Sequence, residues 1–278
     1  MADHLRAGNR GEDPYFESWQ LVAAWGALTS RVRIGVLVSA VTFRHPAVLA
    51  KMAAALDHIS GGRAVLGLGA AWFEAEHTAY GIPFGTKRER GQRLAEAAAI
   101  ARSLFDTRKT TLEGRHYRLR DALAEPKPIQ KRLPILIGGS GDRTVLPVVA
   151  RHADMWNAHG DPAYIEGKLR VLREHCAELG RDPSEIEASS AIRPLVVRDS
   201  AAEIDARFDE IVRRNHQAAR DARFAVTGDV ETVARRLAEF WKVGVSGFIV
   251  QMQSPYDRVS IERLIREVRP RLLELVTA

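Results

Sequence analysis

The segment from Val32 to Phe84 constrains the fold most strongly, because it reads in order as strand, helix, strand and loop. Residues 32–38 and 64–69 are two apolar runs of strand length. Between them, His45-Pro46 is a typical helix start and Gly61-Gly62 a typical helix end. Two covered parallel strands joined by a right-handed crossover accommodate this order, so the segment predicts a βαβ unit.

The rest of the chain continues the alternation of strands and helices. Further strands are predicted at residues 134–139, 155–157, 186–197 and 247–252, and helices at 15–30, 87–105, 143–152, 162–179, 201–217, 229–243 and 259–275. Residues 71–84 are predicted as loop. Residues 107–133 interrupt the pattern with Gly114 and the Pro126-x-Pro128 pair, which indicates a surface insertion that contains a hairpin. The repeated βα order predicts an α/β fold.

The strand count leaves two architectures open. About six strands are predicted, whereas a closed (β/α)₈ barrel has eight, and the gap lies at the amino end, where the repeat starts with a helix. An open doubly wound sheet would need no further strands. A chain of 278 residues with 46% hydrophobic content can bury a large core, and barrels of roughly this length are commonly one domain.

Composition excludes several classes of function. Lys and Arg number 41 against 35 Asp and Glu, giving a net charge of +6, and the arginines alternate with glutamates on helices. No basic stripe carries interleaved aromatic residues, so the sequence does not predict a nucleic-acid-binding protein. Cys176 is the only cysteine and is expected to be a small core residue, which suits a reducing compartment. No apolar run reaches the roughly 18 residues of a membrane span, so we expect a cytoplasmic protein.

Candidate functional residues cluster where strands end. Gly138-Gly139-Ser140 follows a strand and precedes a helix, which suits either a phosphate or a tight turn that needs positive φ. Arg44 and His45 serve either helix entry or an anion contact. Glu76 and His77 could transfer protons, but we expect them to be solvated on a surface loop.

Two further candidates at the end of a strand, Asn157 and His159, follow a later strand of the predicted sheet. No motif typical of a metal site is present, and we expect none. The sequence also lacks the glycine-rich phosphate loop of nucleotide hydrolases and the nucleophile elbow of serine hydrolases.

Several motifs in order resemble the luciferase-like monooxygenase superfamily, and most closely its actinobacterial branch that uses the deazaflavin coenzyme F420. They are Thr42-Phe43-Arg44-His45-Pro46, Ser60-Gly61-Gly62-Arg63, Gly67-Leu68-Gly69-Ala70-Ala71-Trp72, Glu74-Ala75-Glu76-His77, Pro134-Ile135-Leu136-Ile137-Gly138-Gly139 and Ala153-Asp154-Met155-Trp156-Asn157. The resemblance extends over essentially the whole chain.

The resemblance implies a TIM barrel of the (β/α)₈ type that is incomplete at its amino end in this chain. Residues 1–278 would form a single domain with the insertion at about 107–133, and Asp3-His4 would close the second strand of the barrel. The first strand, the first helix and most of the second strand would then be missing. Met1 would accordingly be an internal residue of a longer reading frame.

The resemblance also implies a set of site residues. A non-proline cis peptide at Leu37-Val38 would back the flavin-type ring, and His4 would approach its reactive edge as a catalytic residue. The remaining implied cofactor-binding residues are Asp3, Ala70, Ala71, Gly138, Gly139 and Ser140, of which the last three would hold the phosphate-bearing tail.

The implied reaction is hydride transfer between F420 and a small organic substrate. An FMN-dependent monooxygenase that uses oxygen and a partner reductase is one alternative, and a barrel that binds a flavin or deazaflavin without turnover is another. Trp72 stands where the sugar-phosphate dehydrogenase branch carries an acidic glutamate, so that substrate class is not predicted. The chain could also form a homodimer. Trp19 and Trp25 would then lie either in its interface or packed against the barrel.

Overall fold

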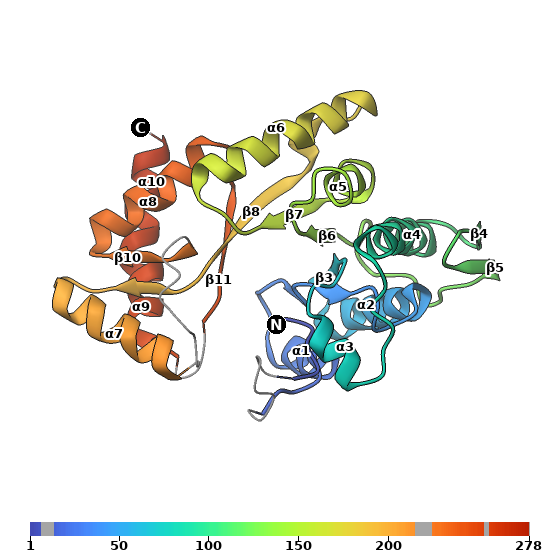
Figure 1. Cartoon of the computed structure of the whole chain (residues 1–278), viewed down its shortest axis with the longest axis horizontal. Coiled ribbons are helices and arrows are strands. Elements are labelled where there is room, and N and C mark those ends of the chain that lie inside the picture. Colours follow the sequence, from blue (N-terminus) through green and yellow to red (C-terminus); the bar gives the residue numbers. More distant parts are fainter. Residues whose placement is uncertain (7–13, 215–223, 253–255, 278) are drawn as a thin grey trace. The chain divides into compact units, whose positions relative to one another are not determined.

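The computed structural model describes residues 1–6, 14–214, 224–252 and 256–277 (Figure 1). The chain divides into two compact units: residues 1–156 with 172–186, and residues 157–171 with 187–278. The assignment of residues 1–278 to a single domain stays a prediction. Among the helices of the described residues, none is long and apolar enough to cross a membrane.

The sheet of the first unit consists of parallel strands. Its strands are β1 (Ile34–Gly35), β2 (Ser39–Ala40), β3 (Ala64–Gly69), β6 (Ile135–Gly138) and the start of β7 (Met155–Ala158). Both β1 and β2 pair in parallel with β3, and β3 pairs in parallel with β6. The predicted βαβ unit is therefore confirmed, and β2, β3 and β6 end at the same edge of the sheet.

The single strand predicted over residues 32–38 is wrong in detail. The run is divided into β1 and β2, and the Leu37-Val38 peptide bond between them is cis. Instead of pairing with β3, the N–H of Leu37 donates to the carbonyl of Met1 over 2.7 Å. The hydrophobic pattern could not reveal this division, because both halves are apolar.

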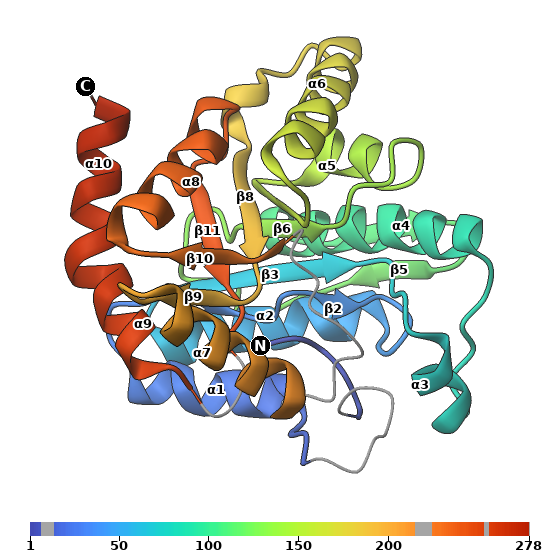
Figure 2. The ribbon, with the colours of Figure 1, turned by 60° about the vertical axis from the view of Figure 1, so that its left-hand side comes forward.

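Helices cover the sheet of the first unit. They are α1 (Ser18–Leu28), α2 (Pro46–Ser60), α4 (Lys87–Asp106) and α5 (Leu146–His152), whereas α3 (Glu74–Ala79) lies in the segment after β3. Helix α2 packs against α1, α4 and β3 (Figure 2). It starts and ends as predicted, with Gly61 in the left-handed conformation at φ 66°. Helix α3 lies within residues 71–84, which were predicted as loop, so that prediction was wrong in part.

The two tryptophans considered for an interface differ in exposure. Trp19 is 4% exposed, and its indole N–H donates to the hydroxyl of Ser39 over 3.1 Å. Trp25 is 40% exposed. Trp19 therefore packs inside the first unit, whereas Trp25 lies at its surface.

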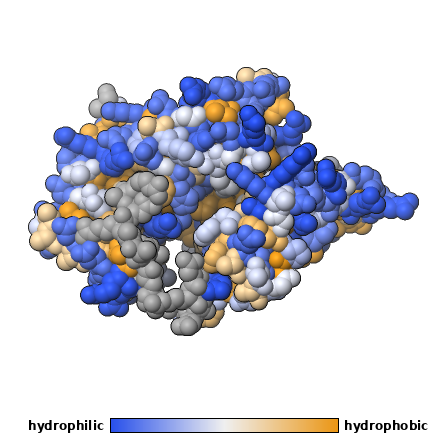
Figure 3. Space-filling model, in the orientation of Figure 1, coloured by the Kyte–Doolittle hydropathy of each residue, from blue (hydrophilic) through white to orange (hydrophobic). Residues whose placement is uncertain are grey.

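The predicted insertion contains an antiparallel hairpin, β4 (Thr110–Glu113) and β5 (Arg118–Ala122). Its outer end is hydrophilic (Figure 3). The carboxylate of Glu96 on α4 accepts the backbone N–H groups of Arg115, His116 and Tyr117 at 2.9–3.0 Å, which ties the turn to the helix. A Cβ at Gly114 would lie 2.4 Å from a Glu96 oxygen, so this close approach needs glycine. The predicted hairpin is confirmed.

The second unit contains two parallel strand pairs. Strand β8 (Glu187–Ile192) pairs with β11 (Gly247–Val250), and β9 (Leu195–Val197) pairs with β10 (Val226–Gly228). The predicted strand 186–197 is interrupted because Pro194 has no N–H to donate to a ladder. Strand β10 was not predicted.

Further α-helices follow in the described part of the chain. They are α6 (Pro162–Glu178), which belongs to both units, α7 (Ala201–Arg214), α8 (Val230–Lys242), α9 (Arg258–Arg263) and, after a π-helical turn at Leu264–Val268, α10 (Arg269–Thr277). The core of the second unit includes Ile192, Val197, Val233, Leu237 and Val268. Residues 215–217 of the helix predicted at 201–217 lie outside the described residues.

Replacing Thr86 with alanine is expected to lower the free energy of unfolding by about 1 kcal/mol. Thr86 and Glu89 form a capping box, in which the Thr86 hydroxyl accepts the N–H of Glu89 over 3.2 Å and the Glu89 carboxylate accepts the N–H of Thr86 over 2.7 Å. Urea unfolding measures the effect. Thr86→Ser keeps the accepting oxygen and serves as the control, so equal losses in both variants would contradict the capping role.

Candidate active site

The carboxyl ends of β2, β3 and β6 bring together two of the predicted cofactor-binding segments. Val38 packs against the glycines of β3 and β6: a Cβ at Gly69 would lie 2.4 Å from Val38 Cγ2, and one at Gly138 would lie 2.9 Å from Val38 Cγ1. The cis peptide implied at Leu37-Val38 is present. The Val38 side chain therefore occupies space that a side chain at Gly69 or Gly138 would fill, and it remains partly exposed.

The turn after β6 is shaped by its glycines. Gly139 has φ 118°, which favours glycine, and its carbonyl accepts the indole N–H of Trp156 over 2.7 Å. Gly139 is exposed and Ser140 is partly exposed, so the turn can be reached by a ligand. Of the two alternatives left open by the sequence, the positive φ supports the tight turn and leaves the phosphate role as a prediction.

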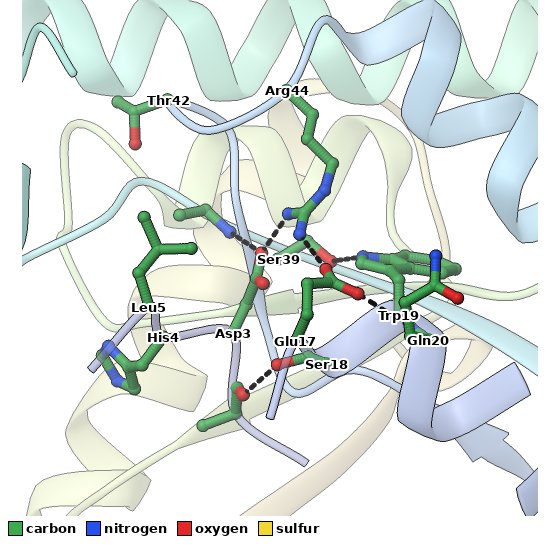
Figure 4. Close-up of polar contacts among 12 residues, drawn as sticks. Asp3, His4, Leu5, Glu17, Ser18, Trp19, Gln20, Ser39, Thr42 and Arg44 are labelled. Atoms are coloured by element: carbon green, nitrogen blue, oxygen red, sulfur yellow. Dashed lines mark hydrogen bonds and ion pairs between the residues drawn. The ribbon is translucent and has the colours of Figure 1, made fainter. Parts of the chain in front are cut away.

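Asp3 anchors the amino-terminal segment to Ala40 at the end of β2 and to Arg44 (Figure 4). Its carboxylate is 4% exposed and accepts the guanidinium of Arg44 over 2.7 Å and the N–H of Ala40 over 3.2 Å. Arg44 also pairs with Glu17, at the start of α1. Two roles were predicted for Arg44, helix entry or contact with an anion. In the structure its guanidinium contacts two carboxylates of the chain itself. His45 caps α2 by accepting the N–H of Ala47 over 3.2 Å.

His4 lies beside α3 in a largely aromatic setting. Its Nδ1 is 3.1 and 3.2 Å from the two carboxylate oxygens of Glu76. The rings of Tyr15, Trp72 and Phe73 meet the imidazole edge-on, with centroids 5.8–6.2 Å away. The predicted catalytic residue is therefore held by a carboxylate and surrounded by rings.

The expectation that Glu76 and His77 are solvated was wrong. Each is 1% exposed, because α3 turns this side of the segment inward. His77 donates from Nδ1 to the carbonyl of Phe73 over 2.8 Å, and its Nε2 forms a hydrogen bond of 2.7 Å with the Thr42 hydroxyl. Both ring nitrogens are thereby used in holding α3 to the segment after β2.

Sequence reasoning missed Glu76 as the partner of His4, although a signal existed. Glu76 and Tyr80 are spaced four residues apart, so in a helical segment they would lie on the same side. Glu76 accepts the N–H of Leu5 over 2.6 Å, and the Tyr80 hydroxyl donates to the carbonyl of Leu5 over 2.7 Å. Spacing alone could not reveal that the amino-terminal segment lies against this side.

Burial changes the acid–base properties of two groups near His4. It raises the pKa of Asp3 above its ordinary value, and the ion pair with Arg44 only partly offsets this effect. Burial also raises the pKa of Tyr15 to about 12, with a further contribution from the charges of Asp3 and Glu76. The Tyr15 hydroxyl therefore stays protonated at neutral pH, and it donates a hydrogen bond to the carbonyl of Ala2 over 2.9 Å.

The other candidates from the sequence lie in different surroundings. Asn157 belongs to the second unit, is buried, and donates from its side-chain amide to the hydroxyl of Ser189 over 2.9 Å. His159 meets the ring of Phe224 edge-on in the same unit, and burial lowers its pKa. Within the described part of the chain, no group of three or more His, Cys, Asp or Glu side chains could hold a metal ion.

The residues at this edge fit a flat ring with a charged tail. Leu37, Val38, Ala70 and Ala71 are partly exposed and present small apolar groups, and Ala71 adopts φ 62°. The exposed backbone of Gly139 lies at the end of the neighbouring strand β6. The edge thus combines apolar side chains with reachable backbone groups, and its predicted role in binding a flavin-type cofactor stays a prediction.

Comparison with known protein sequences shows to which family this chain is related. The sequence model described as luciferase-like monooxygenase matches residues 1–247. A protein of Kineococcus radiotolerans named F420-dependent glucose-6-phosphate dehydrogenase is 33% identical over 211 residues, which are 74% of this chain and 61% of that protein. This chain spans 60–65% of the length of the curated relatives compared with it.

Solved structures show the same fold. An F420-dependent secondary alcohol dehydrogenase in complex with an F420–acetone adduct has a TM-score of 0.83 at 19% identity and covers 98% of this chain and 88% of its own. The monooxygenase RslO1 from Streptomyces bottropensis has a TM-score of 0.81 at 22% identity, with 98% and 86% covered. The predicted α/β fold of the TIM-barrel type is confirmed, and the open doubly wound sheet is not supported. The chain belongs to the luciferase-like monooxygenase family.

Proposed function

We propose that the chain is an oxidoreductase that transfers a hydride between F420 and a small organic substrate. The observation that carries the proposal is the pairing of His4 with buried Glu76 next to an apolar edge built from Val38 and the glycines of β3 and β6. The printed names of a relative and of a structural neighbour, both F420-dependent dehydrogenases, support the choice of cofactor.

Each residue of the proposed site has a distinct task. Leu37 and Val38 would back the ring, and Ala70 and Ala71 would leave room for it because their side chains are small. The backbone N–H groups at Gly138, Gly139 and Ser140 would bind the phosphate of the tail.

The bound deazaflavin would supply the redox chemistry, and the protein would supply placement and proton handling. Asp3 would fix the segment that carries His4, through its contacts with Ala40 and Arg44. His4 would hold or accept a proton at its imidazole. Trp72 is 74% exposed beside the ring of Phe73, and it offers no acid that could serve a sugar phosphate.

A second candidate is an FMN-dependent monooxygenase. It is supported by the structural likeness to RslO1, whose name is that of a monooxygenase. Its cofactor would share the flat ring and phosphate tail, so the same residues would bind it. The non-catalytic barrel has no such specific support.

A fluorescence titration of the purified chain with F420, and separately with FMN, tests the proposal. We expect F420 to bind more tightly than FMN. Replacing Ser140 with aspartate should weaken F420 binding at least about tenfold, because a carboxylate would lie near the phosphate of the tail.

The matched control is Ala201→Asp, which adds the same charge at the exposed start of α7 and should leave F420 affinity unchanged. Equal affinities of wild-type protein and Ser140→Asp would contradict the placement of the tail. Tight binding of FMN without binding of F420 would favour the monooxygenase.

A further inference from the structure

We infer that Glu76 is a positioning residue that fixes the protonation of the His4 ring, so that Nδ1 carries the hydrogen and Nε2 is the atom free to exchange a proton with a ligand. The significance of this inference for catalysis rests on the proposed function, whereas its physical content concerns only side chains of this chain. It deepens that function by naming the atom of His4 that acts and the group that selects it.

The first step concerns the carboxylate of Glu76. It is 1% exposed, and one of its oxygens accepts the N–H of Leu5 over 2.6 Å. An ionised carboxylate can accept hydrogen bonds but cannot donate them. Opposite an ionised Glu76, the His4 Nδ1, which lies 3.1 and 3.2 Å from the two carboxylate oxygens, is the donor and carries a hydrogen.

The second step concerns the opposite side of the ring. A neutral imidazole that carries its hydrogen on Nδ1 has a lone pair on Nε2. Among the residues that the structure describes, none forms a hydrogen bond with His4 Nε2, whereas Nδ1 is engaged twice. The side chain is 24% exposed, so a ligand can reach it.

The third step concerns how firmly the pair is held. Leu5 is fixed from both sides, because its N–H donates to Glu76 and its carbonyl accepts the hydroxyl of Tyr80. Trp72 and Phe73 border the imidazole edge-on. Backbone and ring contacts thus keep Nδ1 against the carboxylate, as a carboxylate orients a catalytic histidine in other enzymes.

Nitrogen-15 NMR of the histidine rings tests the inference directly, without cofactor or substrate. Spectra are recorded at rising pH until the His4 signals no longer change, so that the ring is neutral. His4 signals are identified among the nine histidines by their absence in His4→Asn. In wild-type protein we expect the neutral His4 ring to carry its hydrogen on Nδ1. A ring with its hydrogen on Nε2 would overturn the inference, and this arm needs no variant at Glu76.

Glu76→Gln gives the sharper result. The N–H of Leu5 requires an acceptor at its present position, so the new amide oxygen is expected there and the amide NH₂ is expected to face His4 Nδ1. Two N–H groups repel, so the ring should move its hydrogen to Nε2 and the Nδ1–H signal should be lost. Retention of that signal in Glu76→Gln would show that the carboxylate does not select the tautomer.

The matched control is Glu74→Gln, which removes the same charge from an exposed position of α3 and should leave the His4 signals unchanged. A titration with F420 is run alongside as a separate test of function. Failure of wild-type protein to bind F420 while His4 carries its hydrogen on Nδ1 would refute the proposed function and leave the role of Glu76 standing. If wild-type protein binds F420 and His4 carries its hydrogen on Nε2, the role of Glu76 is refuted and the proposed function stands.

Discussion

Replacing Arg44 with alanine is expected to lower the free energy of unfolding by about 3–5 kcal/mol at neutral pH, the typical cost of removing one partner of a buried ion pair. Arg44 donates to Asp3, which is 4% exposed. Without the guanidinium, the Asp3 carboxylate would keep only the N–H of Ala40 as a described hydrogen-bond donor. Urea unfolding at pH 7 measures the loss.

The loss in Arg44→Ala should depend on pH in a defined direction. Burial already raises the pKa of Asp3 in the folded protein, and removal of Arg44 raises it further. Between the ordinary aspartate pKa of about 3.9 and the raised value, the folded state binds a proton that the unfolded state does not, so stability falls as pH rises. The difference between wild type and variant should therefore be small below about pH 4 and grow toward neutral pH.

Two further variants separate this explanation from a general loss of contacts. Asp3→Asn added to Arg44→Ala removes the buried charge, and it should restore part of the stability and abolish most of the pH dependence. Arg88→Ala removes an arginine from the exposed side of α4 and should change stability by no more than about 0.5 kcal/mol. A deficit in Arg44→Ala that is the same at pH 4 and pH 7 would contradict the role assigned to Asp3.

Replacing Gly69 with alanine is expected to lower the free energy of unfolding by about 1–3 kcal/mol, the usual cost of overpacking. The new methyl group would lie 2.4 Å from Val38 Cγ2, so Val38 would have to move. Because Val38 would back the cofactor ring, we also expect weaker F420 binding. Urea unfolding and the F420 titration measure the two effects.

Val38→Ala tests the cause, since it removes the methyl group with which the new side chain collides. The double variant should be more stable than the sum of the two single losses predicts, by about 1 kcal/mol or more. Gly67→Ala is the contrasting case, because its Cβ would lie 2.0 Å from the backbone carbonyl of Val36. Val38→Ala should not rescue it, and equal rescue of both glycine variants would contradict the assigned contacts.

Local signals in the sequence were sufficient for most of the first unit. Pro46 and Gly61 sit at the ends of α2 as predicted, because proline at a helix start and glycine in the left-handed conformation have strong local preferences. The hairpin at β4 and β5 followed from the break in the alternation. The location of the cis peptide at Leu37-Val38 came from the family resemblance, since nothing in an apolar run indicates it.

What the sequence could not predict depends on contacts between distant residues. Glu76 was expected to be solvated, and only the amino-terminal segment, 71 residues away at Leu5, makes it a buried acceptor. The ion pair of Asp3 and Arg44 likewise joins residues 41 positions apart. Strand β10 was missed because its three residues are too few to show a period and it forms only beside β9.

The attachment of the β4–β5 hairpin has a consequence for protein engineering. Glu96 fixes three consecutive N–H groups of the turn, and the Tyr117 hydroxyl donates to the carbonyl of Val41 over 3.1 Å. The conformation of the turn is thus set by a helix and a neighbouring loop, and depends little on the side chains along the two strands. The exposed strand positions Arg118 and Arg120 can therefore be randomised as a library, with Glu96, Gly114 and Tyr117 kept constant as the scaffold.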